Sequence, residues 1–136
     1  MQSIALQLRA LQFLAHRAHN ECNGDTFFQD HDFFGGLYKS YESHYDDVIE
    51  RIIGLGKEQI SISKINQQAA DMSSVNQGIK DCETFFKIIL KGEEDVCKLV
   101  KMAMSASTDG TQNLLQAIAD ESEKTQYKIK KRLAII

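Results

Sequence analysis

The chain contains neither proline nor tryptophan among its 136 residues. Because proline breaks the interior of an α-helix, its absence permits long uninterrupted helices. No apolar run approaches the roughly 18 residues that a membrane-spanning helix needs. The N-terminal segment 1–9 also lacks the basic stretch and apolar core of a secretory signal peptide. We therefore expect a cytoplasmic protein that does not enter a membrane.

Cysteine is scarce as well. The three cysteines, at positions 22, 82 and 97, form no Cys-x-x-Cys motif, which is typical of reduced thiols rather than of a disulfide framework or a structural zinc site. The formal net charge is −3, and this excludes a protein whose whole surface binds nucleic acid. The length fits one domain, residues 1–136.

Apolar residues recur at helical spacing over most of the chain, and no stretch has the two-residue period of a strand. We expect long helices over residues 4–20, 27–53, 74–104 and 109–133, and a short helix over 61–72. This order predicts an all-α fold. We expect this fold to be an antiparallel four-helix bundle with a short extra helix in the crossover between helices two and three, which is the ferritin-like topology.

Polar residues predict where three of these helices begin. The signals are Thr26 with Gln29 as a capping box, Ser74 with Gln77, and Asp109 or Thr108. The second helix also contains seven aromatic residues, which we expect to form the core of a dimer interface. They are Phe27, Phe28, Phe33, Phe34, Tyr38, Tyr41 and Tyr45.

Two histidines and two carboxylates have the pattern of metal ligands. His19 and His31 flank a loop-like stretch at residues 22–25. Asp46 and Glu50 are four residues apart, so both lie on one face of the predicted second helix. Imidazole and carboxylate together suit iron, zinc or manganese.

The two halves of this set are too far apart to share a metal within one chain. If residues 27–54 form one helix, His31 and Asp46 are separated by 15 residues, or roughly 22 Å at about 1.5 Å per residue. A shared metal requires a second copy of the chain, antiparallel across a two-fold axis near residues 39–41. The Glu-x-x-His motif of larger di-iron bundles is absent, which also disfavours a self-contained site.

The residues around these positions resemble a known family. Segments 18–19, 26–31 and 45–56 are similar to the mini-ferritins called DNA-protection-during-starvation (Dps) proteins, and segment 109–115 resembles their last helix. The resemblance implies a ferroxidase centre formed by His19 and His31 of one subunit and by Asp46 and Glu50 of its two-fold mate. It also implies a hollow homo-oligomer, expected to be a dodecamer, that oxidises Fe(II) with peroxide or oxygen, stores the mineral and protects against oxidative stress.

Two positions depart from the family pattern. Gly35 stands where an Asp usually follows the second His by four residues, and Asn20 stands where a Trp usually follows the first. The loss of a bridging carboxylate weakens the expected metal site. Asp30 and Asp32 are candidates to replace it, although each projects about 100° around the helix from His31.

Gly35 is followed by Gly36, and two glycines inside a helix cost about 2 kcal/mol relative to alanine. Close helix approach, room for a bound group or a local bulge would each explain them. These features leave open an alternative function, a structural assembly that has lost ferroxidase activity.

A third hypothesis is binding to the nucleoid. Its candidate residues are Lys128, Lys130, Lys131 and Arg132. Positive charges also suit the C-terminus of a helix, where they oppose the helix dipole. The N-terminal helix is expected to begin almost at residue 1, which leaves no flexible basic tail there of the kind that DNA-binding members of the family use. DNA is therefore a partner that we do not favour.

Overall fold

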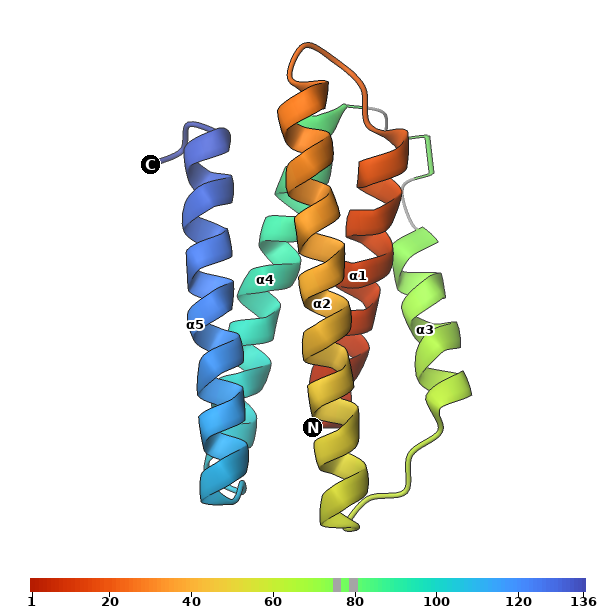
Figure 1. The fold of residues 1–136 in the computed structure, drawn as a ribbon, viewed down its shortest axis with the longest axis vertical. Coiled ribbons are helices and arrows are strands. Elements are labelled where there is room, and N and C mark those ends of the chain that lie inside the picture. The colour runs from red at the N-terminus through yellow and green to blue at the C-terminus, as the bar shows by residue number, and fades with distance from the viewer. Residues whose placement is uncertain (75–76, 79–80) are drawn as a thin grey trace.

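The computed structural model describes residues 1–74, 77–78 and 81–136. Within these ranges the chain forms five helices and no strand (Figure 1). They are α1 (Gln2–Glu21), α2 (Phe27–Leu55), α3 (Ile62–Ser74), α4 (Cys82–Met104) and α5 (Asp109–Arg132). The predicted all-α class and the short helix in the crossover are confirmed. Among the described residues, no helix is both long enough and apolar enough to cross a membrane.

The helices are arranged around α1. Figure 1 shows α1 and α2 antiparallel, with α3 in the long crossover that returns along the bundle. Because of this crossover, α2 and α4 run in the same direction, and α5 returns antiparallel to α4. The principal contacts join α1 to α2, α3 and α4, and join α5 to α4. Each helix buries an apolar stripe against its neighbours, as a bundle requires.

The aromatic residues of α2 do not all serve the role predicted for them. Phe34, Tyr41 and Tyr45 are almost completely buried within their own bundle, so the prediction of a dimer-interface core is wrong for these three. Their spacing places them on the face of α2 that also buries Val48. Phe34 packs on Phe86 of α4 with ring centroids 4.5 Å apart. In contrast, Phe28 is 80% exposed.

The predicted capping box at the start of α2 does not form. Thr26 occupies the N-cap position, but its side chain caps no backbone N–H. The Thr26 hydroxyl instead donates to Oδ2 of Asp30 at 2.6 Å. A hydrogen bond to an ionised carboxylate is stronger than one between neutral groups, which explains why this partner is preferred.

The predicted start of the third long helix is also wrong. Ser74 is the last residue of α3, and α4 begins only at Cys82. Asp81 caps α4 by accepting a hydrogen bond from the backbone N–H of Thr84 at 2.8 Å, and aspartate is among the strongest N-cap residues. Between the helices, Gly78 has a positive φ of 94°, which no helix accommodates. Residues 75, 76, 79 and 80, which the prediction included, lie outside the described residues. The start of α5 is as expected, with Thr108 accepting from the N–H of Thr111, and α2 begins at Phe27 as predicted, although its capping box does not form.

Helices α1 and α4 approach each other closely at Gly92. A Cβ atom at this position would lie 2.5 Å from Cδ2 of Leu11 and 3.2 Å from Nε2 of Gln7. The side chain of Gln7 also donates to the carbonyl oxygen of Gly92 at 3.1 Å. Gly92 therefore permits a contact that any larger residue would obstruct.

The substitution Gly92→Val should lower the free energy of unfolding by about 2 kcal/mol, because overpacking a filled core forces neighbouring side chains to move. Gly54→Val is the matched control, since a Cβ at Gly54 meets no atom within 4 Å. We expect the control to be nearly neutral. Urea unfolding followed by circular dichroism measures both. Equal stability of the two variants would contradict the close approach.

Candidate metal site

His19 and His31 meet across the connection between α1 and α2. His19 lies in the last turn of α1, and His31 lies in the second turn of α2. Nδ1 of each ring lies 2.7 Å from the backbone carbonyl oxygen of the other residue. The two rings stack with centroids 3.7 Å apart and an angle of 18° between their planes. The structure thus brings together the two histidines that the sequence predicted as ligands.

These reciprocal hydrogen bonds fix the tautomer of both rings. A carbonyl oxygen can only accept a hydrogen bond, so each Nδ1 must carry the proton. In a neutral ring, Nε2 then keeps its lone pair and is the atom free to bind a metal. Metal-binding histidines are commonly oriented in this way, by donating their other N–H to a backbone carbonyl or a carboxylate. The Nε2 atoms of His19 and His31 are therefore the candidate metal-binding atoms of the pair.

Aromatic rings enclose the pair on both sides. The ring of Tyr38 meets His19 edge-on at 5.5 Å, and His16 stacks on Tyr38 at 4.3 Å. On the other side, Phe27 lies 5.0 Å from His31. These contacts restrict rotation of both imidazoles.

Gly35 lies directly against the first histidine. A Cβ at Gly35 would be 3.1 Å from both Nδ1 and Cε1 of His19, which is tighter than ordinary packing. Close approach is therefore the explanation that the structure favours for this glycine. Gly36 would meet nothing within 4 Å, and nothing in the structure explains why it is glycine.

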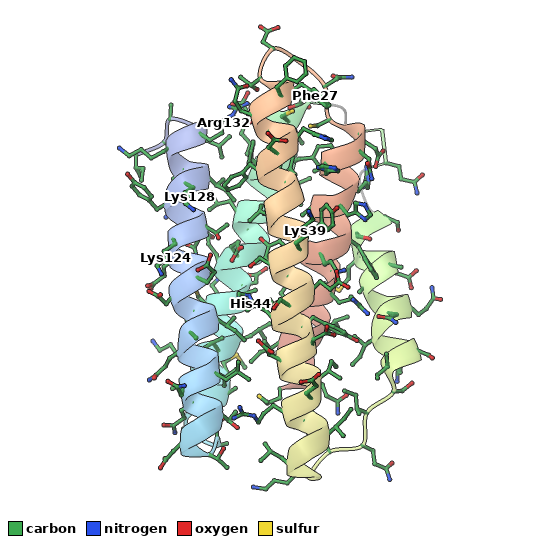
Figure 2. The ribbon with its side chains drawn as sticks, viewed as in Figure 1. Phe27, Lys39, His44, Lys124, Lys128 and Arg132 are labelled. Atoms are coloured by element: carbon green, nitrogen blue, oxygen red, sulfur yellow. The ribbon has the colours of Figure 1, made fainter. Side chains whose placement is uncertain are left out.

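An ion pair holds the start of α2 to the end of α5. Arg132 donates from Nε to Oδ1 of Asp30 at 3.0 Å and from Nη2 to Oδ2 at 2.8 Å. Figure 2 shows Arg132 at the same end of the bundle as Phe27. Burial alone raises the pKa of the Asp30 carboxyl, but the hydrogen bonds from Arg132 and Thr26 outweigh it and leave the pKa lowered. Asp30 immediately precedes His31, so this pair anchors the turn of helix that carries the second histidine.

The remaining predicted ligands lie elsewhere in the chain. Asp46 and Glu50 are exposed on the C-terminal half of α2, and Asp32 is exposed beside His31. Because α2 is one unbroken helix, His31 and Asp46 are roughly 22 Å apart along its axis. Among the described residues, no three His, Cys, Asp or Glu side chains are close enough to hold a metal together.

The middle of the bundle offers no alternative centre. Glu93 is buried there and accepts a hydrogen bond from the hydroxyl of Tyr41. Burial raises the pKa of the Glu93 carboxyl and of the Tyr41 hydroxyl. The cavity beside them has a volume of only about 10 Å³, the lower limit for one water molecule. A metal with its ligands would not fit.

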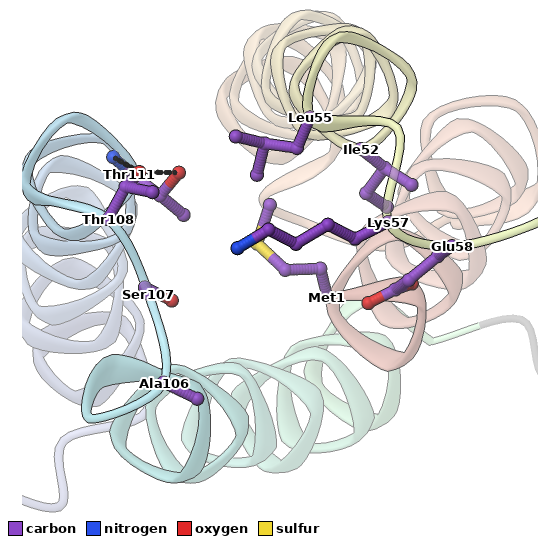
Figure 3. Close-up of a pocket in the computed structure, with 9 residues that line it drawn as sticks. All are labelled: Met1, Ile52, Leu55, Lys57, Glu58, Ala106, Ser107, Thr108 and Thr111. Carbon is purple, nitrogen blue, oxygen red and sulfur yellow. Dashed lines mark hydrogen bonds between the residues drawn. The ribbon is translucent and has the colours of Figure 1, made fainter.

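A second cavity lies at the opposite end of the bundle from the histidines, where α2 ends and α5 begins. Figure 3 shows Lys57 and Met1 directed toward its centre and the hydrogen-bonded Thr108 and Thr111 at its rim. Its volume is about 80 Å³. Glu58 is the one candidate metal ligand in its lining, so this cavity does not compete with the histidine pair.

The basic residues near the end of α5 differ in their surroundings: the arginine forms an ion pair, and the lysines do not share it. Figure 2 shows Lys124, Lys128 and Arg132 on successive turns toward the end of the helix. Arg132 is engaged with Asp30, whereas Lys128 and Lys131 are exposed and Lys130 is half-buried. The ion pair could not be predicted from the sequence, because its partners are 102 residues apart. The local sequence indicates only that Asp30 lies in the first turn of α2 and Arg132 in the last turn of α5, positions where an acidic and a basic residue each suit the helix dipole.

Comparison with known proteins agrees with the ferritin-like fold. The family model for the ferritin-like domain matches residues 4–136. DNA protection during starvation protein 2 of Bacillus anthracis is 29% identical over 125 residues, covering 85% of this chain and 81% of that protein. The nutrient stress-induced DNA-binding protein of Synechococcus sp. is 26% identical over 134 residues, covering 96% and 75%. The DNA protection during starvation protein of Brevibacillus brevis is 28% identical over 114 residues, covering 80% and 75%.

The contact between Gly35 and His19 predicts that Gly35→Ala weakens metal binding. The added methyl group would displace the imidazole and strain its hydrogen bond to the His31 carbonyl. Disturbing such an orienting contact typically lowers metal affinity about tenfold or more. Gly36→Ala is the control one residue away, in open space. Calorimetric titration of the assembled protein with Zn²⁺ compares them, and equal affinities would show that His19 tolerates the methyl group.

The ion pair between Arg132 and Asp30 predicts a stability difference that depends on pH. The pKa of Asp30 is lowered in the folded state, so its stabilisation is complete above the unfolded pKa of about 3.9 and is lost as the pH falls below that value. We expect Arg132→Gln to cost about 2 kcal/mol at neutral pH, less than for a fully buried pair, and progressively less below about pH 4. Lys128→Gln, one turn earlier, is the control. Urea titrations across the pH range measure both, and a loss that is independent of pH would contradict the assignment.

Proposed function

Because the chain belongs to the ferritin-like family and is a Dps-like mini-ferritin, we propose that it oxidises Fe(II) at sites shared between two subunits. The ferric product is stored inside a hollow homo-oligomeric shell. The observation that carries this proposal is the His19–His31 pair, whose Nδ1 atoms are both occupied by carbonyl oxygens. Two imidazoles oriented in this way, with no third ligand close enough among the described residues of their own chain, need ligands from another molecule.

Asp46 and Glu50 are suited to supply those ligands. Both carboxylates are exposed on α2 and are one helical turn apart, so they present a joint surface to a second subunit. An antiparallel partner across a two-fold axis would bring them to the histidine pair. Near the midpoint, Lys39 is exposed and Tyr41 is buried in its own core. Lys39 is therefore the residue at which the axis would pass between the two copies.

The ligand types fit the chemistry of iron oxidation. Neutral imidazole binds Fe(II), and the anionic oxygens of Asp46 and Glu50 favour the harder Fe(III) product. The protein positions the metal and excludes competing ligands, and peroxide or oxygen accepts the electron from Fe(II). Zinc or manganese would occupy the same ligand set without turnover. Asp32 is near enough in sequence to act as an additional ligand.

The proposal extends to the oligomeric state of the protein and to its location in the cell. Each two-fold contact would create two equivalent sites, and further contacts between dimers would close a dodecameric shell. The three free cysteines fit a reducing cytoplasm.

One alternative keeps the assembly and omits the activity. Gly35 stands in place of a carboxylate ligand, and a site without it binds iron less strongly. Such a protein would be a structural or DNA-associated shell. The names of the relatives refer to DNA, and Lys128 and Lys131 are exposed on α5. Binding through these lysines would weaken steeply with salt in a mobility-shift assay.

A complementation experiment tests whether the site is shared. His31→Ala removes an imidazole and Glu50→Gln removes an anionic ligand, so each variant alone should oxidise Fe(II) at least about tenfold more slowly than wild type. Dissociating and reassembling the two variants together creates mixed dimers in which one of the two sites is intact. From equal amounts, about one quarter of the wild-type sites should return.

The absorbance of the ferric product measures the rate. Glu58→Gln, an exposed glutamate in the segment after α2, is the control and should match wild type. Failure of the mixture to recover activity would rule out the shared site. Wild-type rates of Fe(II) oxidation in both single variants would show that His31 and Glu50 do not form the site, which would then lie elsewhere or be absent.

A further inference from the structure

Two of the three cysteines lie side by side, although 60 positions separate them in the sequence. Cys22 follows the last residue of α1, and Cys82 is the first residue of α4; both are buried. An isolated backbone bridge between Asn23 and Asp81 brings these two segments together. Figure 1 shows the α1–α2 connection and the start of α4 at the same end of the bundle.

The two thiol groups lie close enough for each to affect the ionisation of the other. Sγ of Cys82 donates to the carbonyl oxygen of Asn23, the residue after Cys22, at 3.6 Å. Cys97 is different, because it lies 15 residues further along α4, or roughly 22 Å along the helix axis. Its contacts are Ser122 and Gln126 of α5. The chain therefore contains one thiol pair and one separate thiol.

We propose that Cys22 and Cys82 are a peroxide-oxidised dithiol that closes to an intramolecular disulfide. One thiol loses its proton and attacks hydrogen peroxide, forming an S–O bond while the O–O bond breaks, and the first water leaves. The second thiol then attacks the resulting sulfenic acid. The S–S bond forms, the S–O bond breaks and the second water leaves. Two thiols lose two electrons, and one peroxide molecule is reduced to two molecules of water.

Burial holds both thiols in the protonated form. It raises the pKa of the Cys22 thiol. It also raises the pKa of the Cys82 thiol, and the contacts of Cys82 with Cys22 and Asp30 add to that rise. With little thiolate at neutral pH, the pair reacts slowly and stays reduced until peroxide accumulates.

The new bond would join the end of α1 to the start of α4. The closed loop contains α2 and α3, and with them all the proposed metal ligands except His19. Oxidation would add a covalent constraint beside the ion pair of Asp30, at the end of the bundle that carries the histidines. The proposal concerns thiols alone and does not depend on iron oxidation.

The test uses full-length, metal-free protein in the presence of a chelator. After treatment with hydrogen peroxide, the protein is denatured and alkylated, and its mass is measured. We expect one alkyl group per chain, on Cys97, instead of the three of the untreated protein, and a peptide that links Cys22 to Cys82. The rate of closure should rise about tenfold per pH unit while the pH remains below the thiol pKa.

Cys22→Ser and Cys82→Ser should each abolish the linked peptide, and Cys97→Ser should leave it unchanged. Retention of all three alkylation sites after peroxide treatment would overturn the proposal. So would oxidation of Cys22 and Cys82 to sulfinic acid without a linked peptide. Because no metal is present, failure here is distinguishable from failure of the proposed ferroxidase activity.

Discussion

The length and stiffness of α2 constrain everything else in the proposed mechanism. The helix runs without interruption from Phe27 to Leu55, so a residue in its second turn and a residue in its C-terminal half cannot approach each other. Histidines at one end and carboxylates toward the other are thus complementary halves that a single chain keeps apart. Under our proposal, catalysis depends on quaternary structure, because one subunit positions the two sets of ligands but cannot bring them together.

Helix α1 supplies the support that this arrangement needs. It packs against three of the other helices, and glycines lie at two of its close contacts, Gly35 against His19 and Gly92 against Leu11. In both places the missing side chain lets another residue take a defined position. The absence of a side chain allows close helix packing at Gly92 and leaves room for the imidazole of His19 at Gly35.

The helices could be predicted from the sequence because periodic apolar residues report burial directly. Local signals were less reliable where two partners competed. Thr26 was expected to cap a helix but donates to Asp30, and Ser74 was expected to begin a helix that Asp81 begins instead. The choice of His19 and His31 came from spacing and family resemblance. Their hydrogen bonds to each other's carbonyl groups could not be predicted, because they depend on how two helices meet.

The pairing of Asp30 with Arg132 links the order of the histidine pair to the docking of α5. The arginine lies in the last turn of α5, 102 residues after its carboxylate partner. Separation of α5 from the bundle would break both hydrogen bonds to Asp30, and the first turn of α2 would lose an anchor next to His31. Local unfolding at one helix terminus therefore loosens a histidine that belongs to another helix.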